Sequence, residues 1–439
     1  MVRRTRTGRS LGSGESRMTH IAVAGAGPSG IFATAALLKR DDVRVDVFDR
    51  SPTPFGLVRY GVAPDHLKIK SVARTLHRTM SDPRVTFRGN VTLGRDLALD
   101  ELQREYAAVV LATGAPRARR LDIPGEDLPG HISASTLVDW YNGRPAVRKG
   151  QNAERVVVIG AGNVALDIAR VLLRGRRGLA HTDVTDTVLQ ALDRNPVRDL
   201  RVLVRRGVAG TKFTPAELLE LDKLPDLDIA VDPGELTLTA DDRRRYETDR
   251  AVAARVEVFR RWSTRPRTGA RRRLTFRFRQ EPEALTGADR VEAVLLRGGE
   301  CVPADLVVSA IGYRGAPLDG APFDEALGRI PHVRGRVRPG LYTTGWAKRG
   351  PSGVIGTNKA CAIETVKTLL ADLGADGRTP DIDAVLAAKG VRVVTWPGWL
   401  AIDEAEIVLG ARNDRTRTKI DDLARLVEIG AEGGRTWPT

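Results

Sequence analysis

The stretch HIAVAGAGPSG, residues 20–30, decides the fold. Its first half is apolar, as expected for a buried strand, and its second half matches the GxGxxG pattern at Gly25, Gly27 and Gly30. Residues 31–39 then have helical character. In a strand–turn–helix unit these glycines permit a tight turn, close approach of the backbone to a pyrophosphate, and packing of helix on strand. The stretch therefore predicts a dinucleotide site, with Pro28 and Ser29 at the start of the phosphate-binding helix.

An acidic residue at the end of the next strand supports this interpretation. A second strand is expected at residues 43–48, and Asp49 follows it, 19 residues after Gly30. A carboxylate at this position binds ribose hydroxyls. Since it would repel a 2′-phosphate, the predicted ligand of this first site is FAD or NAD.

The pattern restarts at residue 155. An apolar strand at 155–159 is followed by a second glycine-rich turn, GAGNVA, whose Ala161, Gly162, Asn163 and Val164 begin another helix. The strand expected at 200–204 ends in Arg205 and Arg206. Two planar guanidinium groups suit a 2′-phosphate, so this second site is predicted to select NADP over NAD. The alternative is that they are ordinary surface arginines of an Arg-rich protein.

Alternating strand and helix signals predict an α/β fold with two Rossmann-like dinucleotide-binding domains, the NADP domain inserted in the FAD domain. The FAD domain is expected to comprise residues 18–115 and 340–439, and the NADP domain residues 116–339. Residues 1–17, rich in Arg, Gly and Ser, are interpreted as a disordered basic arm. A mitochondrial transit peptide or a mis-assigned start before Met18 are the alternatives.

Composition excludes several classes of protein. The 439 residues are 42% hydrophobic, which is too apolar for a wholly disordered chain, and they contain no run long enough for a membrane helix. Cys301 and Cys361 lie in no CxxC motif, so neither a dithiol relay nor a protein-bound iron–sulfur cluster is expected, and we predict no metal site. The net charge of +15 favours acidic partners or reflects an Arg bias.

The charged segment between residues 222 and 300 is expected to contain antiparallel strands at 273–279 and 291–296. Trp262, Phe276 and Phe278 alternate with arginines there, a pattern that a nucleic-acid surface also shows. The alternation favours an exposed edge strand instead. In the C-terminal segment, Trp396 and Trp399 are expected to flank a turn.

Further segments link the two predicted sites. Residues 109–115, which include Gly114, and residues 307–313 look like the return strands that connect flavin and nicotinamide domains. A glycine-rich loop at 350–356 precedes a helix expected near 359–370, whose positive end would face the flavin. An FAD site and an NADP site in one chain imply hydride transfer between nicotinamide and flavin.

These motifs resemble the adrenodoxin reductase type of ferredoxin–NADP reductase over residues 21–370. The most specific pieces are PTPFGLVRYGVAPDH (52–66), GNVALDIAR (162–170), RRG (205–207) and GWAKRGPSGVIGTNK (345–359). The family usually has Glu where Asp49 stands, and Val208–Lys212 departs from the family pattern, which bears on the placement of Glu217.

The resemblance implies contacts to both cofactors. Those to FAD are at Ser29, Asp49, Leu57, Val91, Trp346, Gly353, Val354 and Ile355. Those to NADP are at Arg119, Ala161, Gly162, Asn163, Val164, Arg205, Arg206, Glu217 and Gly353. His66 and Glu217 match polar positions where nicotinamide and flavin meet, which predicts a catalytic role in substrate positioning or proton supply; a solvated structural histidine is the alternative.

The predicted function is hydride transfer from NADPH to FAD, followed by delivery of single electrons to an acidic ferredoxin-type iron–sulfur protein. An alternative enzyme is an NADPH-dependent flavin input subunit similar to the small subunit of glutamate synthase. The alternative from another class is a basic nucleic-acid-binding protein with an inactive nucleotide fold. We expect a cytoplasmic monomer without membrane insertion, or a mitochondrial matrix protein if residues 1–17 are a transit peptide.

Overall fold

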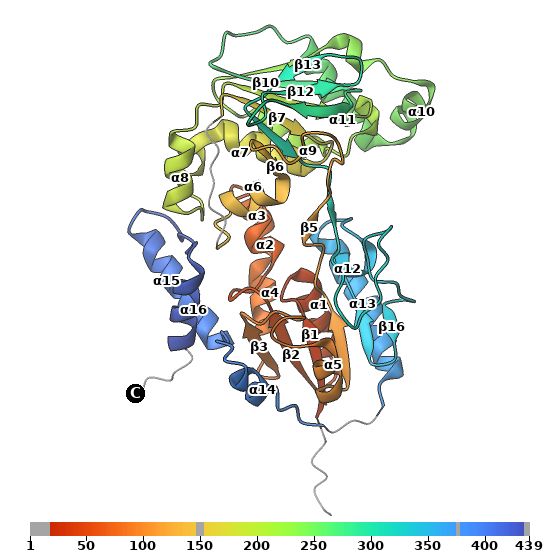
Figure 1. Cartoon of the computed structure of the whole chain (residues 1–439), viewed down its shortest axis with the longest axis vertical. Helices are drawn as coiled ribbons and strands as arrows, with labels where there is room; N and C mark the ends of the chain where they lie inside the picture. The colour runs from red at the N-terminus through yellow and green to blue at the C-terminus, as the bar shows by residue number, and fades with distance from the viewer. Residues whose placement is uncertain (1–17, 146–152, 375–377, 434–439) are drawn as a thin grey trace, which may run out of the picture.

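The computed structural model describes residues 18–145, 153–374 and 378–433. It has two lobes (Figure 1), each built on a six-stranded sheet. The predicted arm at residues 1–17 lies outside the described residues.

The first sheet has the strand order β16-β17-β4-β1-β2-β3 and is parallel except for β16. Its strands are β1 (Thr19–Ala24), β2 (Val43–Asp49), β3 (Val85–Gly89), β4 (Ala108–Leu111), β16 (Arg336–Arg338) and β17 (Leu341–Thr343). Residues of β1 and β4 are buried on both sides, because helices and loops cover both faces of a parallel sheet. The chain thus returns to the first sheet after a long excursion.

Helices of this lobe include α1 and α13, which pack together on one face of the sheet. The full set is α1 (Pro28–Leu37), α2 (Leu57–Tyr60), α3 (Leu67–Lys70), α4 (Ala73–Met80), α5 (Leu99–Glu105), α12 (Trp346–Arg349), α13 (Ile355–Asp372), α14 (Ile382–Ala388), α15 (Trp396–Ala411) and α16 (Leu423–Glu432). Helix α13 begins four residues earlier than predicted, at Ile355.

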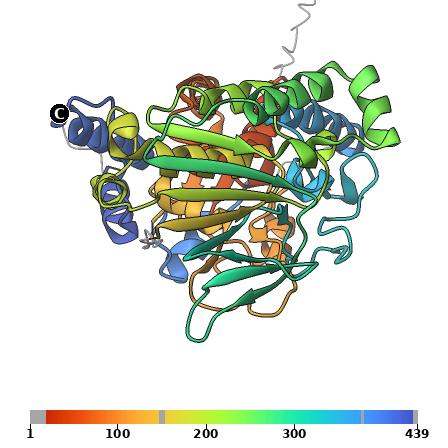
Figure 2. The same cartoon turned by 90° about the horizontal axis from the view of Figure 1, so that it is seen from above.

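The second sheet, seen in Figure 2, is parallel throughout and has the order β6-β14-β7-β8-β10-β9. Its strands are β6 (His131–Ser133), β7 (Arg155–Ile159), β8 (Asp199–Val204), β9 (Leu227–Val231), β10 (Arg272–Phe278) and β14 (Leu306–Ser309). All of them lie between β4 and β16 in the sequence. Two Rossmann-like units, the second inserted in the first, are thereby confirmed.

The second lobe also contains α6 (Ala134–Tyr141), α7 (Asn163–Leu179), α8 (Asp186–Asp193), α9 (Pro215–Leu221), α10 (Ala240–Thr248) and α11 (Arg250–Ser263). A small antiparallel sheet joins β11 (Pro282–Thr286), β12 (Ala293–Leu296) and β13 (Cys301–Pro303). The chain passes between the lobes twice, and the two passages pair as β5 (Arg117–Ala118) and β15 (Tyr313–Arg314).

Two sequence predictions about local structure are wrong. Strand β10 is neither antiparallel nor at an edge: it lies between β8 and β9, parallel to both, and Phe276 and Phe278 are in the core. Its arginines misled the prediction because Arg277 is neutralised by Glu235 and Glu300. Trp396 and Trp399 do not flank a turn; both lie in the first turns of α15.

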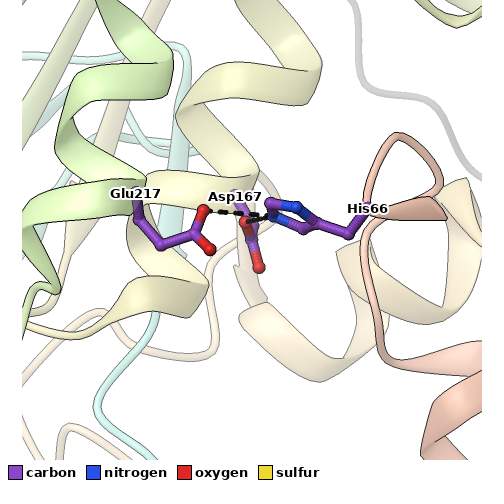
Figure 3. A group of neighbouring side chains, drawn as sticks. All are labelled: His66, Asp167 and Glu217. Carbon is purple, nitrogen blue, oxygen red and sulfur yellow. Dashed lines mark hydrogen bonds and ion pairs between the residues drawn. The ribbon is translucent and has the colours of Figure 1, made fainter. Parts of the chain in front are cut away.

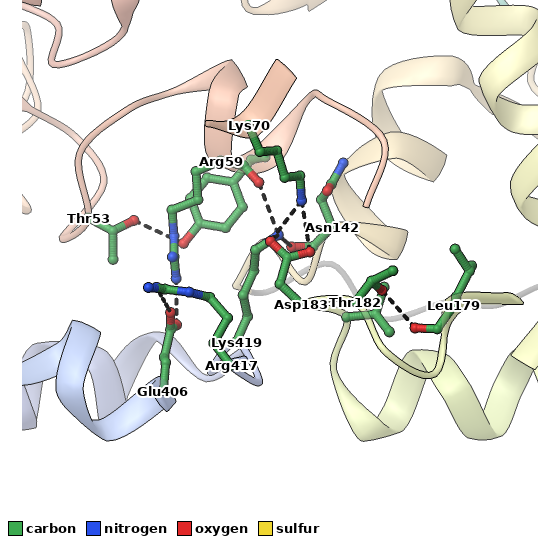
Figure 4. Close-up of polar contacts among 12 residues, drawn as sticks. Thr53, Arg59, Lys70, Asn142, Leu179, Thr182, Asp183, Glu406, Arg417 and Lys419 are labelled. Atoms are coloured by element: carbon green, nitrogen blue, oxygen red, sulfur yellow. Dashed lines mark hydrogen bonds and ion pairs between the residues drawn. The ribbon is translucent and has the colours of Figure 1, made fainter. Parts of the chain in front are cut away.

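Buried charges hold the lobes and the C-terminal segment together (Figure 4). Lys419 donates to the carbonyl oxygens of Arg59 and Asn142, each at 3.0 Å, and pairs with Asp183 at 3.1 Å. Asp183 also accepts from Lys70 at 2.7 Å. This junction therefore ties α2 and α3 of the first lobe to the loop after α7 of the second, through the segment that follows α15.

Candidate functional site

The first glycine turn leaves an uncapped helix start with an open face. Helix α1 has Gly27 at its N-cap and no side chain hydrogen-bonded there. A Cβ on Gly27 would meet only the Cα of Gly56, at 4.0 Å, whereas one on Gly25 would lie 2.4 Å from the carbonyl oxygen of Ala112. Gly25 is thus required by the fold, while the space beside Gly27 and the free N–H groups fit a bound phosphate.

Asp49 lies next to this turn, as its position at the end of a strand predicts. Its carboxylate accepts hydrogen bonds from the backbone N–H of Ala26 at 2.7 Å and of Ser51 at 2.8 Å. Burial raises the pKa of Asp49, and these two hydrogen bonds oppose the shift. Each oxygen keeps a lone pair for a ribose hydroxyl.

The other predicted FAD residues surround the same edge of the first sheet. Val91 is buried, whereas Leu57 and Val354 are exposed by 40% and 75%, which is unusual for apolar side chains of this size. The indole nitrogen of Trp346 is buried without a partner, and its ring lies 5.9 Å from that of Tyr313. Exposed apolar surface and a buried donor without a partner fit a site for a large aromatic cofactor.

Gly345, which precedes Trp346, and the predicted site residues Gly353 and Gly114 occupy special backbone positions. Gly345 packs on Ser29 so closely that a Cβ would lie 2.0 Å from the serine Oγ. Gly353 has a φ of +83° and Gly114 a φ of +73°. A Cβ on Gly114 would meet no atom within 4 Å, so the chain is open there as well.

The second turn repeats the arrangement in the second lobe. Helix α7 starts after Gly162 without a side-chain cap, and a Cβ on Gly162 would meet nothing within 4 Å. The next residue, Asn163, accepts from the backbone N–H of Thr214 at 2.9 Å. Ala161 accepts from the backbone N–H of Lys212 at 2.7 Å. The departure of Val208–Lys212 from the family pattern therefore does not detach α9 from the turn.

Cationic side chains mark the far end of this second site. Arg205 and Arg206 follow β8, are exposed, and have no ion-pair partner in the described ranges. Arg119 lies apart from them, on the linking segment, where its Nε donates to the carbonyl oxygen of Tyr313 at 3.2 Å. Two unpaired guanidinium groups are free to bind an anion.

The two lobes meet at His66, Asp167 and Glu217 (Figure 3). The Nε2 atom of His66, which precedes α3, is 3.1 Å from a carboxylate oxygen of Asp167 on α7 and 3.1 Å from one of Glu217 in the first turn of α9. The structure thus brings together His66 and Glu217, which lie 151 positions apart in the sequence.

Charge explains how this junction is held. Hydrogen bonds to Asp167 and then Glu217 raise the pKa of His66 to about 9, against burial and the nearby Arg170. The hydrogen bond to His66 in turn lowers the pKa of Glu217. The two carboxylates favour the protonated imidazole, while Nη2 of Arg170, 2.5 Å from the same Nε2 atom, opposes it.

Sequence reasoning missed four residues of this junction, which are Asp65, Asp167, Arg170 and Arg174. Arg170 on α7 pairs with Asp167 and with Asp65, and Asp65 also accepts from Arg174 at 2.9 Å. Asp167 and Arg170 are one helical turn apart in the GNVALDIAR stretch, and this spacing could have predicted their ion pair. His66, Asp167 and Glu217 are close enough together to hold a metal ion. However, the guanidinium group of Arg170 already pairs with Asp167 and supplies positive charge at this position.

No helix within the described ranges combines the length and apolar character needed to cross a membrane.

Several known proteins are similar to this chain in sequence and structure. A family model described as pyridine nucleotide-disulphide oxidoreductase matches residues 19–205. NADPH-ferredoxin reductase FprA of Mycobacterium tuberculosis is 40% identical, covering 94% of this chain and 99% of its own length. The mitochondrial NADPH:adrenodoxin oxidoreductase of Homo sapiens is 37% identical, covering 95% and 93%. The solved structure of M. tuberculosis FprA in complex with NADPH has a TM-score of 0.89 and 40% identity, covering 94% of this chain and 100% of that one.

Proposed function

Because the chain belongs to the adrenodoxin reductase type of ferredoxin–NADP reductase family, we propose that it transfers electrons from NADPH through FAD to a ferredoxin-type iron–sulfur protein. When bound, FAD supplies the chemistry that side chains lack, since it accepts a hydride and releases electrons singly. One observation carries the proposal: two uncapped glycine turns, one in each lobe, are joined by the contact of His66 with Glu217.

The first lobe is proposed to hold FAD. Gly27, Pro28 and Ser29 would bind its pyrophosphate through the start of α1, and Asp49 its ribose. The remaining contacts are assigned to Gly25, Leu57, Val91, Gly114, Trp346, Gly353, Val354 and Ile355. The unpartnered indole N–H of Trp346 supports its assignment as a donor to the cofactor.

The second lobe is proposed to hold NADP. Ala161, Gly162, Asn163 and Val164 would bind the pyrophosphate, and Arg205 and Arg206 the 2′-phosphate. Arg119, Glu217 and Gly353 complete the set. The Asn163–Thr214 hydrogen bond couples this turn to the helix that carries Glu217, so nucleotide binding and the junction are mechanically linked.

His66 and Glu217 are proposed to position the nicotinamide at the junction of the lobes. Nε2 of His66 lies 3.1 Å from a carboxylate oxygen of Asp167 and of Glu217, and these two contacts orient the imidazole ring. A positive charge on His66 would also offset the negative charge that develops during hydride transfer. Because this geometry is set before the substrates arrive, little reorganisation is needed for transfer.

The proposal has four further parts. We propose that the acceptor is acidic, that the protein is a monomer, that it is cytoplasmic, and that its reaction is that of a ferredoxin–NADP(+) reductase in the strict sense. The net charge of +15 supports an acidic acceptor through long-range attraction. The domain boundaries given above also remain a prediction.

Nucleotide preference tests the proposal. In a diaphorase assay with ferricyanide, the FAD-loaded protein is expected to prefer NADPH over NADH. Removing two charge-assisted contacts in Arg205→Ala/Arg206→Ala should reduce kcat/KM for NADPH about 100-fold or more and leave that for NADH almost unchanged.

The matched control is Arg176→Ala/Arg177→Ala, which removes two exposed arginines without ion pairs in the described ranges from the end of α7. Equal use of NADH and NADPH by the unmodified protein would contradict the second nucleotide site.

A further inference from the structure

A groove of about 840 Å³ opens on the first lobe, between α1, the α3–α4 segment and the first two turns of α13. Helix α1 packs against both α4 and α13 (Figure 1). Residues from all three helices line the groove. Its lining comprises Phe32, Lys68, Ile69, Ser71, Val72, Arg74, Thr75, Arg78, Ile355, Gly356 and Lys359. It contains no acidic residue.

Four cations line this groove without partners. Lys68, Arg74, Arg78 and Lys359 are exposed, and none of them forms an ion pair within the described part of the chain. Their neighbour Lys70 behaves differently, since it points to the other side of the segment and binds Asp183. Four like charges in one groove repel one another, and a partner of opposite charge would relieve that repulsion.

The groove also has an apolar component. Ile69 is 41% exposed, and Phe32, Val72 and Ile355 line the same groove. A lining that combines exposed apolar side chains with charged ones suits a protein partner. A site for a free phosphate or another small anion would have no use for the exposed isoleucine.

We propose that this groove is the docking surface for the acidic iron–sulfur protein. The inference rests on the proposed function, in which electrons leave FAD for such an acceptor. Its location supports it: Ile355 is both a wall of the groove and a proposed FAD contact. A partner seated here lies next to the flavin site, whereas the proposed NADP contacts at Arg205 and Arg206 remain uncovered on the other lobe.

The reaction balances with two docking events. One NADPH gives up two electrons and becomes NADP⁺ with release of a proton, and two oxidised acceptor molecules each take one electron. Each acceptor must leave before the next one binds. Contacts at a solvated rim suit this exchange, because they raise the association rate without slowing release.

The test separates the groove from the rest of the enzyme. In FAD-loaded Lys68→Glu/Arg74→Glu/Arg78→Glu, NADPH:ferricyanide activity should stay within about twofold of the unmodified protein, because no proposed cofactor contact is changed. With a purified acidic [2Fe–2S] ferredoxin, followed by cytochrome c reduction at low ionic strength, KM for ferredoxin should rise roughly tenfold or more. The salt dependence of that KM should flatten.

The matched control carries the same change in net charge elsewhere. Arg334, Arg392 and Arg412 are exposed, lie outside the groove and form no ion pairs within the described ranges. Arg334→Glu/Arg392→Glu/Arg412→Glu should leave KM for ferredoxin nearly unchanged. If both triple variants raise it equally, overall charge and not the groove attracts the acceptor, and the proposal fails.

Other outcomes are also informative. If the unmodified protein has ferricyanide activity but does not reduce the ferredoxin, the proposed acceptor and the groove assignment fall together. If ferredoxin is reduced and the groove variant behaves like the unmodified protein, only the groove assignment is wrong. If the groove variant loses binding to duplex DNA that the unmodified protein shows, and its KM for ferredoxin is unchanged, the groove binds nucleic acid instead.

Discussion

Replacing His66 by Gln removes the positive charge between Asp167 and Glu217 and should remove a pH-dependent part of the stability. Folding raises the pKa of His66 from 6.5 to about 9. A pKa raised by folding means that the stabilisation is complete below about pH 6.5 and is lost as the pH rises to about 9. The full shift corresponds to at most about 3–4 kcal/mol. Water reaches 16% of the side chain, so we expect about 1–3 kcal/mol.

The assay is urea unfolding of the FAD-loaded protein at several pH values between 6 and 10. Lys419 also titrates abnormally, since burial lowers its pKa well below the usual value, and it changes stability in the opposite sense as the pH rises. That contribution is common to both proteins. The difference between the unmodified protein and His66→Gln therefore isolates the histidine, and it should shrink towards zero at the upper end of the range.

An exposed histidine serves as the control, and His181→Gln should leave the pH profile unchanged. If His66→Gln has the same pH dependence as the unmodified protein, the imidazolium is not held by the two carboxylates, and the electrostatic account of the junction is wrong.

The other expected outcomes concern the two turns and the lobe junction. Asp49→Ala should weaken FAD binding about 10- to 100-fold by equilibrium dialysis, because Ala26 and Ser51 lose their acceptor along with the ribose contact; equal flavin retention by Asp49→Ala and the exposed Asp41→Ala would contradict this. Gly162→Val should fold and bind FAD normally, since a Cβ at this position meets no atom within 4 Å. Its side chain should nevertheless fill the space for the phosphate and raise KM for NADPH more than about tenfold. An unchanged KM would contradict the second nucleotide site. Lys419→Met should lower the free energy of unfolding by about 2–4 kcal/mol, because two carbonyl groups and Asp183 lose a buried donor; a change below about 0.5 kcal/mol would show that the junction contributes little.

Local signals predicted both nucleotide turns. Gly25 and Gly162 stand between an apolar strand and a helix, and the constraints on them act over a few residues. Asp49 was accessible for the same reason, since its distance from the turn is set by one helix and one strand. The fold class then followed from the repetition of this unit.

Tertiary contacts limited the rest. Nothing near His66 in the sequence indicates that Asp167 is its partner, because the contact depends on how the two lobes pack. Strand β10 was misassigned because its alternating arginines suggest a strand with one face exposed to solvent. In the structure, Glu235 and Glu300, which lie in other segments, neutralise Arg277. The start of α15 was missed although Thr395 and Pro397 form a regular helix beginning, in which the Thr395 side chain accepts from the backbone N–H of Gly398.

Anaerobic mixing of the FAD-loaded protein with an equimolar amount of NADPH tests most directly whether one chain brings the two nucleotides together. Rapid loss of the visible flavin absorbance with NADPH, and a much slower loss with NADH, is the predicted result. A protein that takes up FAD but keeps its full absorbance after NADPH is added, or one that takes up no FAD at all, would contradict the account.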